Sequence, residues 1–311
     1  MNALDVAAMF EIEQLPVTFF VVSQLVEHDE ALAEALITAG EVGTQTVDHT
    51  PLAGLTAQDQ ILRLRRSFDD IESWTGVAPA GLRPPEEVFD ARTLSAWRLA
   101  GGRYVLTGNE ARSASPELHE TPNGLLVLLP RLLKDDYTVV VRDVTLRSQR
   151  LADAFLAGTR KMRAIGGLAV VAGHTQIIVR GPRLDAIRTV ADTVRAQGDW
   201  WLARADEVAT WWLARSAVEL TWVVAEAPPS GRNMRPSGPE DLLVSLASGA
   251  GLEDFWVDIV APKLGPNVIP LVDGISVVFV ETGWGMRVRV GSLSVGEVRR
   301  ISLVSVDAPE P

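Results

Sequence analysis

The chain has 311 residues, of which 47% are hydrophobic and 22% are charged, and its formal net charge at pH 7 is −11. A chain of this length and composition can bury at least one complete hydrophobic core and is long enough for two domains. The negative charge argues against nucleic acid or an anionic membrane surface as a partner, because phosphate groups select basic surfaces. The lack of cysteine excludes disulfides, catalytic thiolates and Cys-ligated zinc.

The sequence predicts no membrane span. No segment reaches the ~18 consecutive apolar residues expected of a spanning helix. The first residues, MNALDVAAMFEIEQL, are acidic and lack the cationic and apolar pattern of an export signal. Composition leaves the compartment and the oligomeric state open.

Residues 1 to about 215 alternate short apolar runs with helical patterns. The run from Val17 to Val22 is nearly continuous, as is typical of a strand covered on both faces. Thr56 and Asp59 approximate a capping box before an apolar stripe at helical spacing from Ile61 to Ile71. This alternation favours parallel strands joined by helical crossovers. The other predicted elements are helices at 29–39, 91–100, 146–165 and 184–196, strands at 104–107 and 168–172, and a polar loop at 108–123.

After Ser216 the pattern changes to short strand-like segments separated by Pro, Gly, Asn and Asp clusters. No helical stripe appears among them, and several short strands at this spacing predict a small β-sandwich. We therefore expect two domains, at residues 1–215 and 217–311. The predicted strands of the second domain are 218–224, 242–246, 255–260, 277–280, 286–290 and 299–306.

Two motifs stand in order in the first domain: EVGTQTVDHTPL, from Glu41 to Leu52, and GLRPPEE, from Gly81 to Glu87. The first resembles the pattern Glu-Ile-Gly-Asn-His-Thr-x-x-His-x-x-Leu of the polysaccharide deacetylase (NodB-homology) family. The second resembles the Arg-Pro-Pro segment on the family's next strand. The resemblance covers roughly residues 4–215 and implies an α/β fold, an incomplete (β/α) barrel of the NodB-homology type, followed here by the β-sandwich. Further similar segments are LPVTFFV at 15–21, PRLLKDDY at 130–137 and the stretch 166–174.

In this family two histidines of the first motif bind a catalytic divalent metal of the zinc type. Here His49 stands at the second histidine position and Gln45 at the first. The family's opening strand, Thr-Phe-Asp-Asp-Gly, supplies the catalytic base and a third metal ligand, and the sequence contains no such segment. Catalytic zinc sites ordinarily have three protein ligands, so His49 predicts a degenerate metal site. The alternative is that His49 is a polar residue hydrogen-bonded in a cleft.

His174 corresponds by this resemblance to the family's late histidine, which acts as the general acid. A histidine at the end of a strand can protonate a leaving group near neutral pH, or it can simply cap the strand. Asp135 and Asp136 could be mistaken for an acid/base pair, but they precede Tyr137 in a segment that predicts a solvated polar turn.

Arg83 corresponds to the family's arginine that orients the catalytic aspartate. Without that aspartate we expect a structural ion pair, for which the nearby carboxylates are Glu86, Glu87 and Asp90. Pro84 and Pro85 follow as candidates for substrate contact. Since His49, Arg83 and His174 each follow an apolar strand, we expect them to converge at the C-terminal ends of the parallel strands.

The resemblance implies hydrolytic removal of acetyl groups from a glycan, and family members are commonly extracytoplasmic. The replaced histidine predicts that this activity is weak or absent here. The alternative is a catalytically inactive glycan-binding or scaffold protein, with the β-domain as an interaction module.

Overall fold

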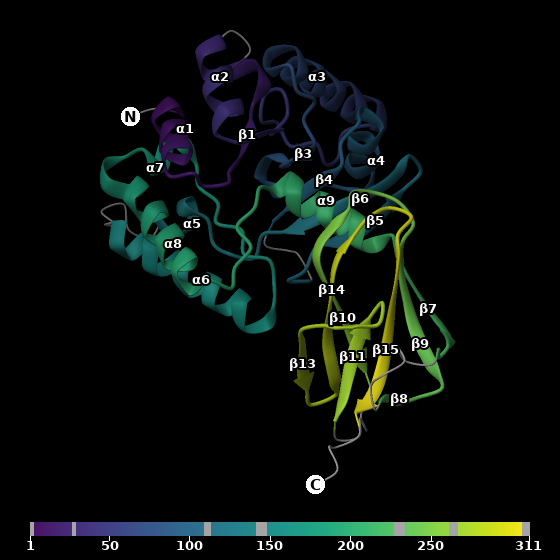
Figure 1. Cartoon of the computed structure of the whole chain (residues 1–311). Helices are drawn as coiled ribbons and strands as arrows, with labels where there is room; N and C mark the ends of the chain where they lie inside the picture. Colours follow the sequence, from purple (N-terminus) through teal and green to yellow (C-terminus); the bar gives the residue numbers. More distant parts are fainter. Residues whose placement is uncertain are drawn as a thin grey trace. The chain divides into compact units, whose positions relative to one another are not determined.

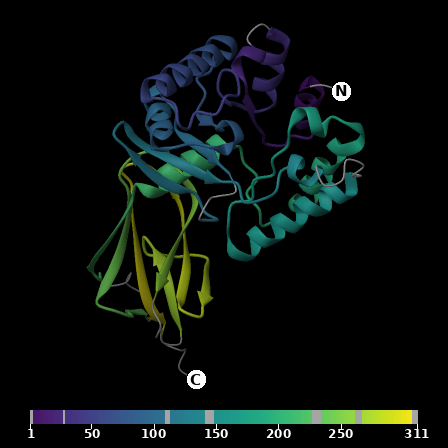
Figure 2. The ribbon, with the colours of Figure 1, turned by 180° about the vertical axis from the view of Figure 1, so that it is seen from behind.

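The computed structural model describes residues 3–26, 29–108, 113–140, 148–226, 234–260 and 267–306. The chain divides into two compact units, Met1–Ala209 and Thr210–Pro311. The boundary lies inside helix α9 (Ala205–Ser216), a few residues before the predicted change of pattern. Helices surround strands in the first unit, whereas the second is built from strands (Figures 1 and 2).

The first unit is built on a six-stranded sheet with the strand order β1-β2-β3-β4-β6-β5. Neighbours from β1 to β6 are parallel, and only β5 runs antiparallel, against β6. Among the described strands, β1 lies at one edge and pairs only with β2. This parallel sheet confirms the predicted fold class. The strands are β1 (Thr18–Val21), β2 (Glu41–Thr44), β3 (Gly81–Leu82), β4 (Tyr104–Thr107), β5 (Glu117–Thr121) and β6 (Gly124–Pro130).

Helix α3 shows how the local sequence sets an element's ends. The Thr56 hydroxyl oxygen accepts from the Asp59 backbone N–H at 3.2 Å, and Gly76 ends the helix in the left-handed conformation with φ 73°. Its apolar stripe packs with α4 around the fully buried Leu64 and Trp97. The helices before α9 are α1 (Ala3–Ile12), α2 (Glu30–Ala39), α3 (Ala57–Thr75), α4 (Ala91–Ala100), α5 (Asp136–Val140), α6 (Ser148–Ile165), α7 (Thr175–Ile178) and α8 (Leu184–Gln197), with 3₁₀ turns η1 (Ser23–Leu25), η2 (Pro85–Glu87) and η3 (Gly181–Arg183).

Two sequence predictions are wrong in the first unit. Residues 168–172, predicted as a strand, are not one. The Leu168 N–H donates to the Ala114 carbonyl and the Ala172 carbonyl accepts from the Asp136 N–H, but a strand requires a continuous ladder of such bonds. The polar segment 108–123, predicted as a loop, contains β5, which is held by its antiparallel pairing with β6.

The second unit consists of antiparallel sheets whose inner faces share one core. A larger sheet has the order β12-β11-β15-β9-β7, with β8 beside β15, and a smaller one has the order β10-β14-β13. Val244 of the larger sheet and Val288 of the smaller one are both fully buried in this core. The strands are β7 (Val218–Val224), β8 (Met234–Pro236), β9 (Glu240–Leu246), β10 (Leu252–Val260), β11 (Val268–Val272), β12 (Ile275–Ser276), β13 (Phe279–Thr282), β14 (Gly285–Leu293) and β15 (Val298–Val306).

The side chain of Glu41 joins the sheet of the first unit to the start of α9. Its carboxylate accepts hydrogen bonds from the Thr18 and Tyr104 hydroxyls at 2.8 Å and from the Asp206 backbone N–H at 3.0 Å. It thereby satisfies an N–H in the first turn of α9, which has no partner within the helix. Burial and the nearby Asp206 carboxylate raise the pKa of Glu41 to about 7, although the hydrogen bonds act in the opposite direction.

We expect the free energy of unfolding to fall as pH rises from about 4.5 to about 7, because unfolded Glu41 loses its proton at a lower pH than folded Glu41. Glu41→Gln should remove this slope, on the order of 2–3 kcal/mol across the window. An amide can accept from Thr18 and Asp206 while donating to the Tyr104 hydroxyl. Urea unfolding at pH 5 and pH 8 measures the difference.

The matched control is Glu34→Gln, which changes an exposed glutamate on α2. That variant should keep the pH dependence of the unmodified chain. An unchanged slope in Glu41→Gln would show that Glu41 ionises normally in the folded protein.

Candidate functional site

The loop after β2 carries the first candidate residues, and its start lies beside the end of β3. The Arg83 N–H donates to the Thr44 carbonyl at 2.9 Å, so Arg83 and Gln45 follow neighbouring parallel strands at the same end of the sheet. The loop turns through left-handed backbone at Thr46 (φ 68°) and His49 (φ 61°). Gln45 is half-buried and His49 is exposed.

The donors around His49 do not fit a zinc-type metal. The neighbouring carboxylate, Asp48, accepts from the Arg63 guanidinium at 2.9 and 3.0 Å and from the Thr50 N–H at 3.0 Å. Burial favours a higher pKa for Asp48, but these hydrogen bonds and the Arg63 charge outweigh it and lower the pKa. In the described ranges no group of three or more His, Cys, Asp or Glu side chains is placed to hold a metal ion. A three-ligand catalytic site is therefore not assembled by these residues.

His174 lies against the carboxylate of Asp136. Its Nδ1 is 2.7 Å from Asp136 Oδ1, and its backbone N–H donates to Oδ2 at 2.8 Å. Asp136 is 0% exposed and Asp135 is 7% exposed, so the predicted solvated turn is wrong. A carboxylate bound at Nδ1 fixes the imidazole ring and leaves Nε2 as the nitrogen that can exchange a proton with a ligand.

Glu87 is the centre of a buried ion-pair network. Its carboxylate accepts two hydrogen bonds from the Arg131 guanidinium, both at 2.6 Å, and a third from Arg83 Nη2 at 3.2 Å. The structure thus selects Glu87 among the three carboxylates that the sequence offered to Arg83. Parallel two-point binding of this kind gives a guanidinium and a carboxylate a fixed relative orientation.

Asp135 extends the network toward His174. Its Oδ2 lies 3.8 Å from the guanidinium groups of both Arg83 and Arg131. Burial favours a higher pKa for Asp135, but hydrogen bonds from Thr138 and the charge of Arg131 lower it. Because Asp135 adjoins Asp136, the network places Arg83 and His174 in one cluster.

The remaining predicted residues take different positions. Pro84 and Pro85 are buried, and Pro85 begins the 3₁₀ turn η2 (Pro85–Glu87). Within the described part of the chain, no hydrogen bond or ion pair joins His49 to the cluster of Arg83 and His174. The convergence of the three on one cleft and the substrate contacts of the prolines stay predictions.

Sequence reasoning did not identify Arg131 and Asp136 as site residues. Both lie in the segment PRLLKDDY, which follows β6. β6 is parallel to β4, so residues after it emerge at the same end of the sheet as those after β3. Their position after a parallel strand could have identified Arg131 and Asp136 as candidate site residues, because ligands of parallel sheets bind beyond the carboxyl ends of the strands.

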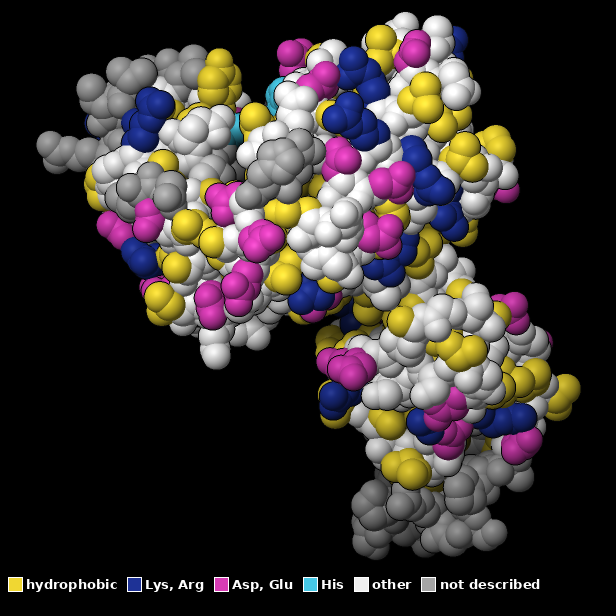
Figure 3. Space-filling view, turned by 90° about the horizontal axis from the view of Figure 1, so that it is seen from above, with side chains coloured by type: hydrophobic (Ala, Val, Ile, Leu, Met, Phe, Trp, Pro, Cys, Tyr) yellow, Lys and Arg dark blue, Asp and Glu magenta, His cyan; other side chains and the backbone are white. Residues whose placement is uncertain are grey.

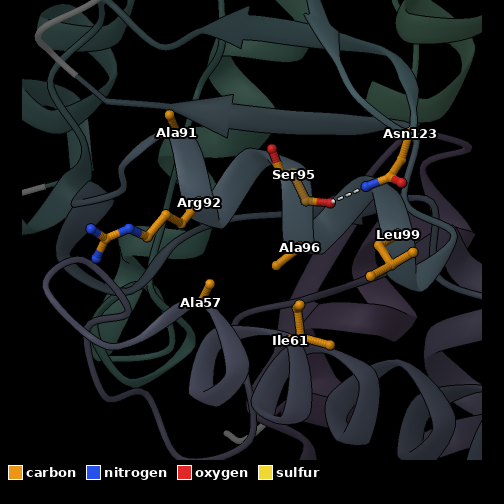
Figure 4. Close-up of a pocket in the computed structure, with 8 residues that line it drawn as sticks. All are labelled: Ala57, Ile61, Ala91, Arg92, Ser95, Ala96, Leu99 and Asn123. Carbon is orange, nitrogen blue, oxygen red and sulfur yellow. Dashed lines mark hydrogen bonds between the residues drawn. The ribbon is translucent and has the colours of Figure 1, made fainter.

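A separate groove of about 270 Å³ lies between α3 and α4 (Figure 4). It shares no residue with the cluster of Arg83 and His174. Its walls are mostly small and apolar, and Asn123 donates across one end to the Ser95 carbonyl at 3.3 Å. The groove offers no pair of titratable groups for chemistry. Its lining residues are Ala57, Ile61, Ala91, Arg92, Ser95, Ala96, Leu99 and Asn123.

The face shown in Figure 3 carries basic side chains interspersed with acidic ones. On α3, Arg65 and Arg66 lie one helical turn from Asp69 and Asp70, at 3.8 Å in each pair. This mixed surface does not form the continuous basic area that binds a phosphate backbone. None of the helices in the described ranges is both long and apolar enough to cross a bilayer.

Residues 3–105 match the family model for polysaccharide deacetylases. No curated protein matches the chain. A putative polysaccharide deacetylase from Mycobacterium smegmatis is similar in structure, with TM-score 0.60 and 24% identity over 67% of this chain and 76% of that one. A probable polysaccharide deacetylase from Pseudomonas aeruginosa PAO1 has TM-score 0.56 and 13% identity over 67% and 71%.

Puue allantoinase is also similar, with TM-score 0.59 and 14% identity over 67% of this chain and 71% of that one. Structures described as deacetylases and as an allantoinase therefore share this fold. The fold alone does not specify a substrate, which has to be argued from the site.

We expect Glu87→Ala to lower the free energy of unfolding by about 3–5 kcal/mol, because it leaves buried Arg131 and Arg83 without their shared carboxylate. Glu86→Ala is the matched control, since Glu86 has the same left-handed backbone (φ 56°) but an exposed side chain. It should change stability by less than about 0.5 kcal/mol. Urea unfolding of both variants measures the difference, and equal effects would contradict a central role for Glu87.

Proposed function

We propose that this chain, whose residues 3–105 match the family model of polysaccharide deacetylases, binds an acetylated glycan beside His174 and hydrolyses the acetyl groups weakly or not at all. The observation that carries the proposal is a mismatch within the site. His174 Nδ1 lies 2.7 Å from the Asp136 carboxylate, which can orient the imidazole ring. In the loop after β2, Asp48 is bound by Arg63, and among the described residues no group of three or more His, Cys, Asp or Glu side chains is placed to hold a metal ion.

The Asp136–His174 pair supports a role in recognising or protonating the ligand. Hydrogen bonding to Asp136 directs one imidazole nitrogen inward and leaves Nε2 to contact a ligand oxygen or nitrogen. The ring is partly accessible, with 27% of the His174 side chain exposed. Tyr137 lies at its edge, 6.1 Å between ring centroids, and is 57% exposed. An exposed aromatic ring beside a polar group is suited to stacking on a sugar ring.

The nearby carboxylates are poorly placed to replace a missing base. The Glu87 oxygens already accept three hydrogen bonds from arginines, and Asp135 accepts from Thr138 while lying between two guanidinium groups. Burial alone would raise the pKa of Asp135, but the Thr138 hydrogen bonds and the Arg131 charge lower it, so Asp135 is a weak acceptor for a proton from water. Activation of water is therefore the step that the cluster supports least.

The second candidate function is an inactive glycan-binding or scaffold protein. The network of Glu87, Arg83 and Arg131 favours it, because its ion pairs form without a ligand and hold the walls of the site in a fixed arrangement. A preformed site binds its ligand without the cost of ordering those side chains.

We expect the purified chain to release little or no acetate from N-acetylated or O-acetylated oligosaccharides with added zinc, cobalt or nickel. Gln45→His should raise zinc affinity by about tenfold or more, because it provides an imidazole four residues from His49. Gln58→His, at an exposed position on α3, is the matched control and should leave zinc affinity unchanged. Calorimetry measures metal binding, and an acetate assay measures turnover.

Oligosaccharide binding is measured in the same preparations without metal. Binding that is lost in His174→Ala but kept in His119→Ala would support a glycan site beside His174. Robust metal-dependent acetate release by the unmodified chain would overturn the impaired-site proposal. Absence of glycan binding in all preparations would overturn the binding proposal.

A further inference from the structure

Strand β7 (Val218–Val224) forms an edge of the larger sheet in the second unit. It pairs with β9 along its whole length, from Val218 opposite Leu246 to Val224 opposite Glu240, in one unbroken register. Among the described strands none pairs with its other side. An edge of this length offers a regular row of backbone groups to a further strand.

The hydrogen bonds at the two ends of β7 show which backbone groups face outward. The Ala217 carbonyl accepts from the Ala247 N–H at 3.0 Å, and the Ala225 N–H donates to the Pro239 carbonyl at 2.9 Å. Residues in an antiparallel ladder alternate between bonding to one neighbour and to the other. The odd-numbered residues therefore bond to β9, and the groups that point to the open edge belong to Val218, Leu220, Trp222 and Val224.

The side chains of the same four residues lie on the core side of the sheet. Leu220 is opposite Val244 and Trp222 is opposite Leu242, and both of these β9 residues are buried core residues. Yet Leu220 and Trp222 are each 55% exposed, and Val224 is 82% exposed. On its core face, the larger sheet thus ends at the open edge in an exposed apolar strip formed by Leu220, Trp222 and Val224.

The edge lacks the devices that normally prevent strand addition. Protected edges carry charges, proline, bulges or short strands. β7 has seven residues, VELTWVV, with Glu219 as its single charge, no proline and no break in register. An edge with unpaired backbone groups and an apolar strip favours a partner strand that is apolar on the same face.

We propose that β7 is an interface between two copies of this chain, in which the two β7 strands pair antiparallel about a twofold axis at Thr221. Because Thr221 is the middle residue of β7, an axis there pairs all seven residues of one strand with the seven of the partner subunit's strand. On each side of the axis, Leu220 of one copy lies opposite Trp222 of the partner subunit. The backbone groups that face the open edge of one strand then meet those of the other. Glu219 falls opposite Val223 of the partner subunit, so no like charges meet.

This self-complementarity selects a second copy over an unrelated strand. Each apolar side chain of the strip meets an apolar side chain of the partner subunit on the same face, where cross-strand pairs of this kind contribute about 0.2–1 kcal/mol each. Twofold symmetry generates the whole interface from one strand. A single strand pair is small beside the ~1,200 Å² of a stable interface, so the dimer depends on concentration.

The chain contains no cysteine, which permits a direct test by cross-linking. Thr221 opposes itself across the proposed axis as a pair without backbone hydrogen bonds, where Cβ atoms come about 4.5–5.5 Å apart. This spacing is close to that of a disulfide. Thr221→Cys should therefore form a disulfide-linked dimer under mild oxidation, at least about tenfold faster than Glu281→Cys, which changes an exposed residue on β13, the edge of the smaller sheet. Non-reducing electrophoresis measures the two rates.

Sedimentation across a dilution series of the unmodified full chain provides the second measurement. We expect a monomer–dimer equilibrium that shifts to monomer in Thr221→Lys, because two ammonium groups would then meet across the axis, and that persists in Glu281→Lys. Equal cross-linking rates in the two cysteine variants would overturn the proposal. A chain that stays monomeric throughout the series, or a dimer that survives Thr221→Lys, would also overturn it.

Discussion

The two-point hydrogen bonding of Arg131 to Glu87 is the constraint on which the candidate site depends. These residues are 44 positions apart and belong to segments that follow different strands, β6 and β3. Their pairing fixes the η2 turn, whose Glu86 and Glu87 both adopt left-handed backbone that costs free energy for residues other than glycine. Asp135 and Asp136 lie in the segment that Arg131 begins, so the same contact positions the carboxylate that holds His174. The chemistry of the cluster is set by a structural ion pair.

Features encoded by neighbouring residues could be predicted from the sequence. The α3 cap at Thr56, the alternation of strands and helices before α9, and the short strands after it depend on local patterns, and the structure has them. The ion-pair partner of Arg83 could likewise be predicted as one of three carboxylates, because all three lie within seven residues of it in the sequence.

The rest depends on contacts between distant residues. Asp136 is buried and its carboxylate contacts His174, 38 residues later. No local pattern distinguishes such a residue from one in a solvated turn. Residues 168–172 have the composition of a strand, but a strand needs a continuous ladder of backbone hydrogen bonds with a neighbour, and with the described residues they form only isolated bonds. The polar residues of β5 gave no strand signal because its pairing with β6 at the sheet edge, and not burial, holds it.

Helix α9 belongs to both units, since the division after Ala209 falls within it. Its Ala214 is 0% exposed in the core of the second unit, and Trp211 packs against the same core. Its first turn is held by Glu41 of the first unit. Proteolysis or gene truncation at the apparent sequence boundary near residue 216 would therefore separate the β-sheets from part of their own core. A fragment that contains the second unit with its whole core therefore has to begin before Trp211. Transfer of this unit to another protein would likewise have to include the second half of α9.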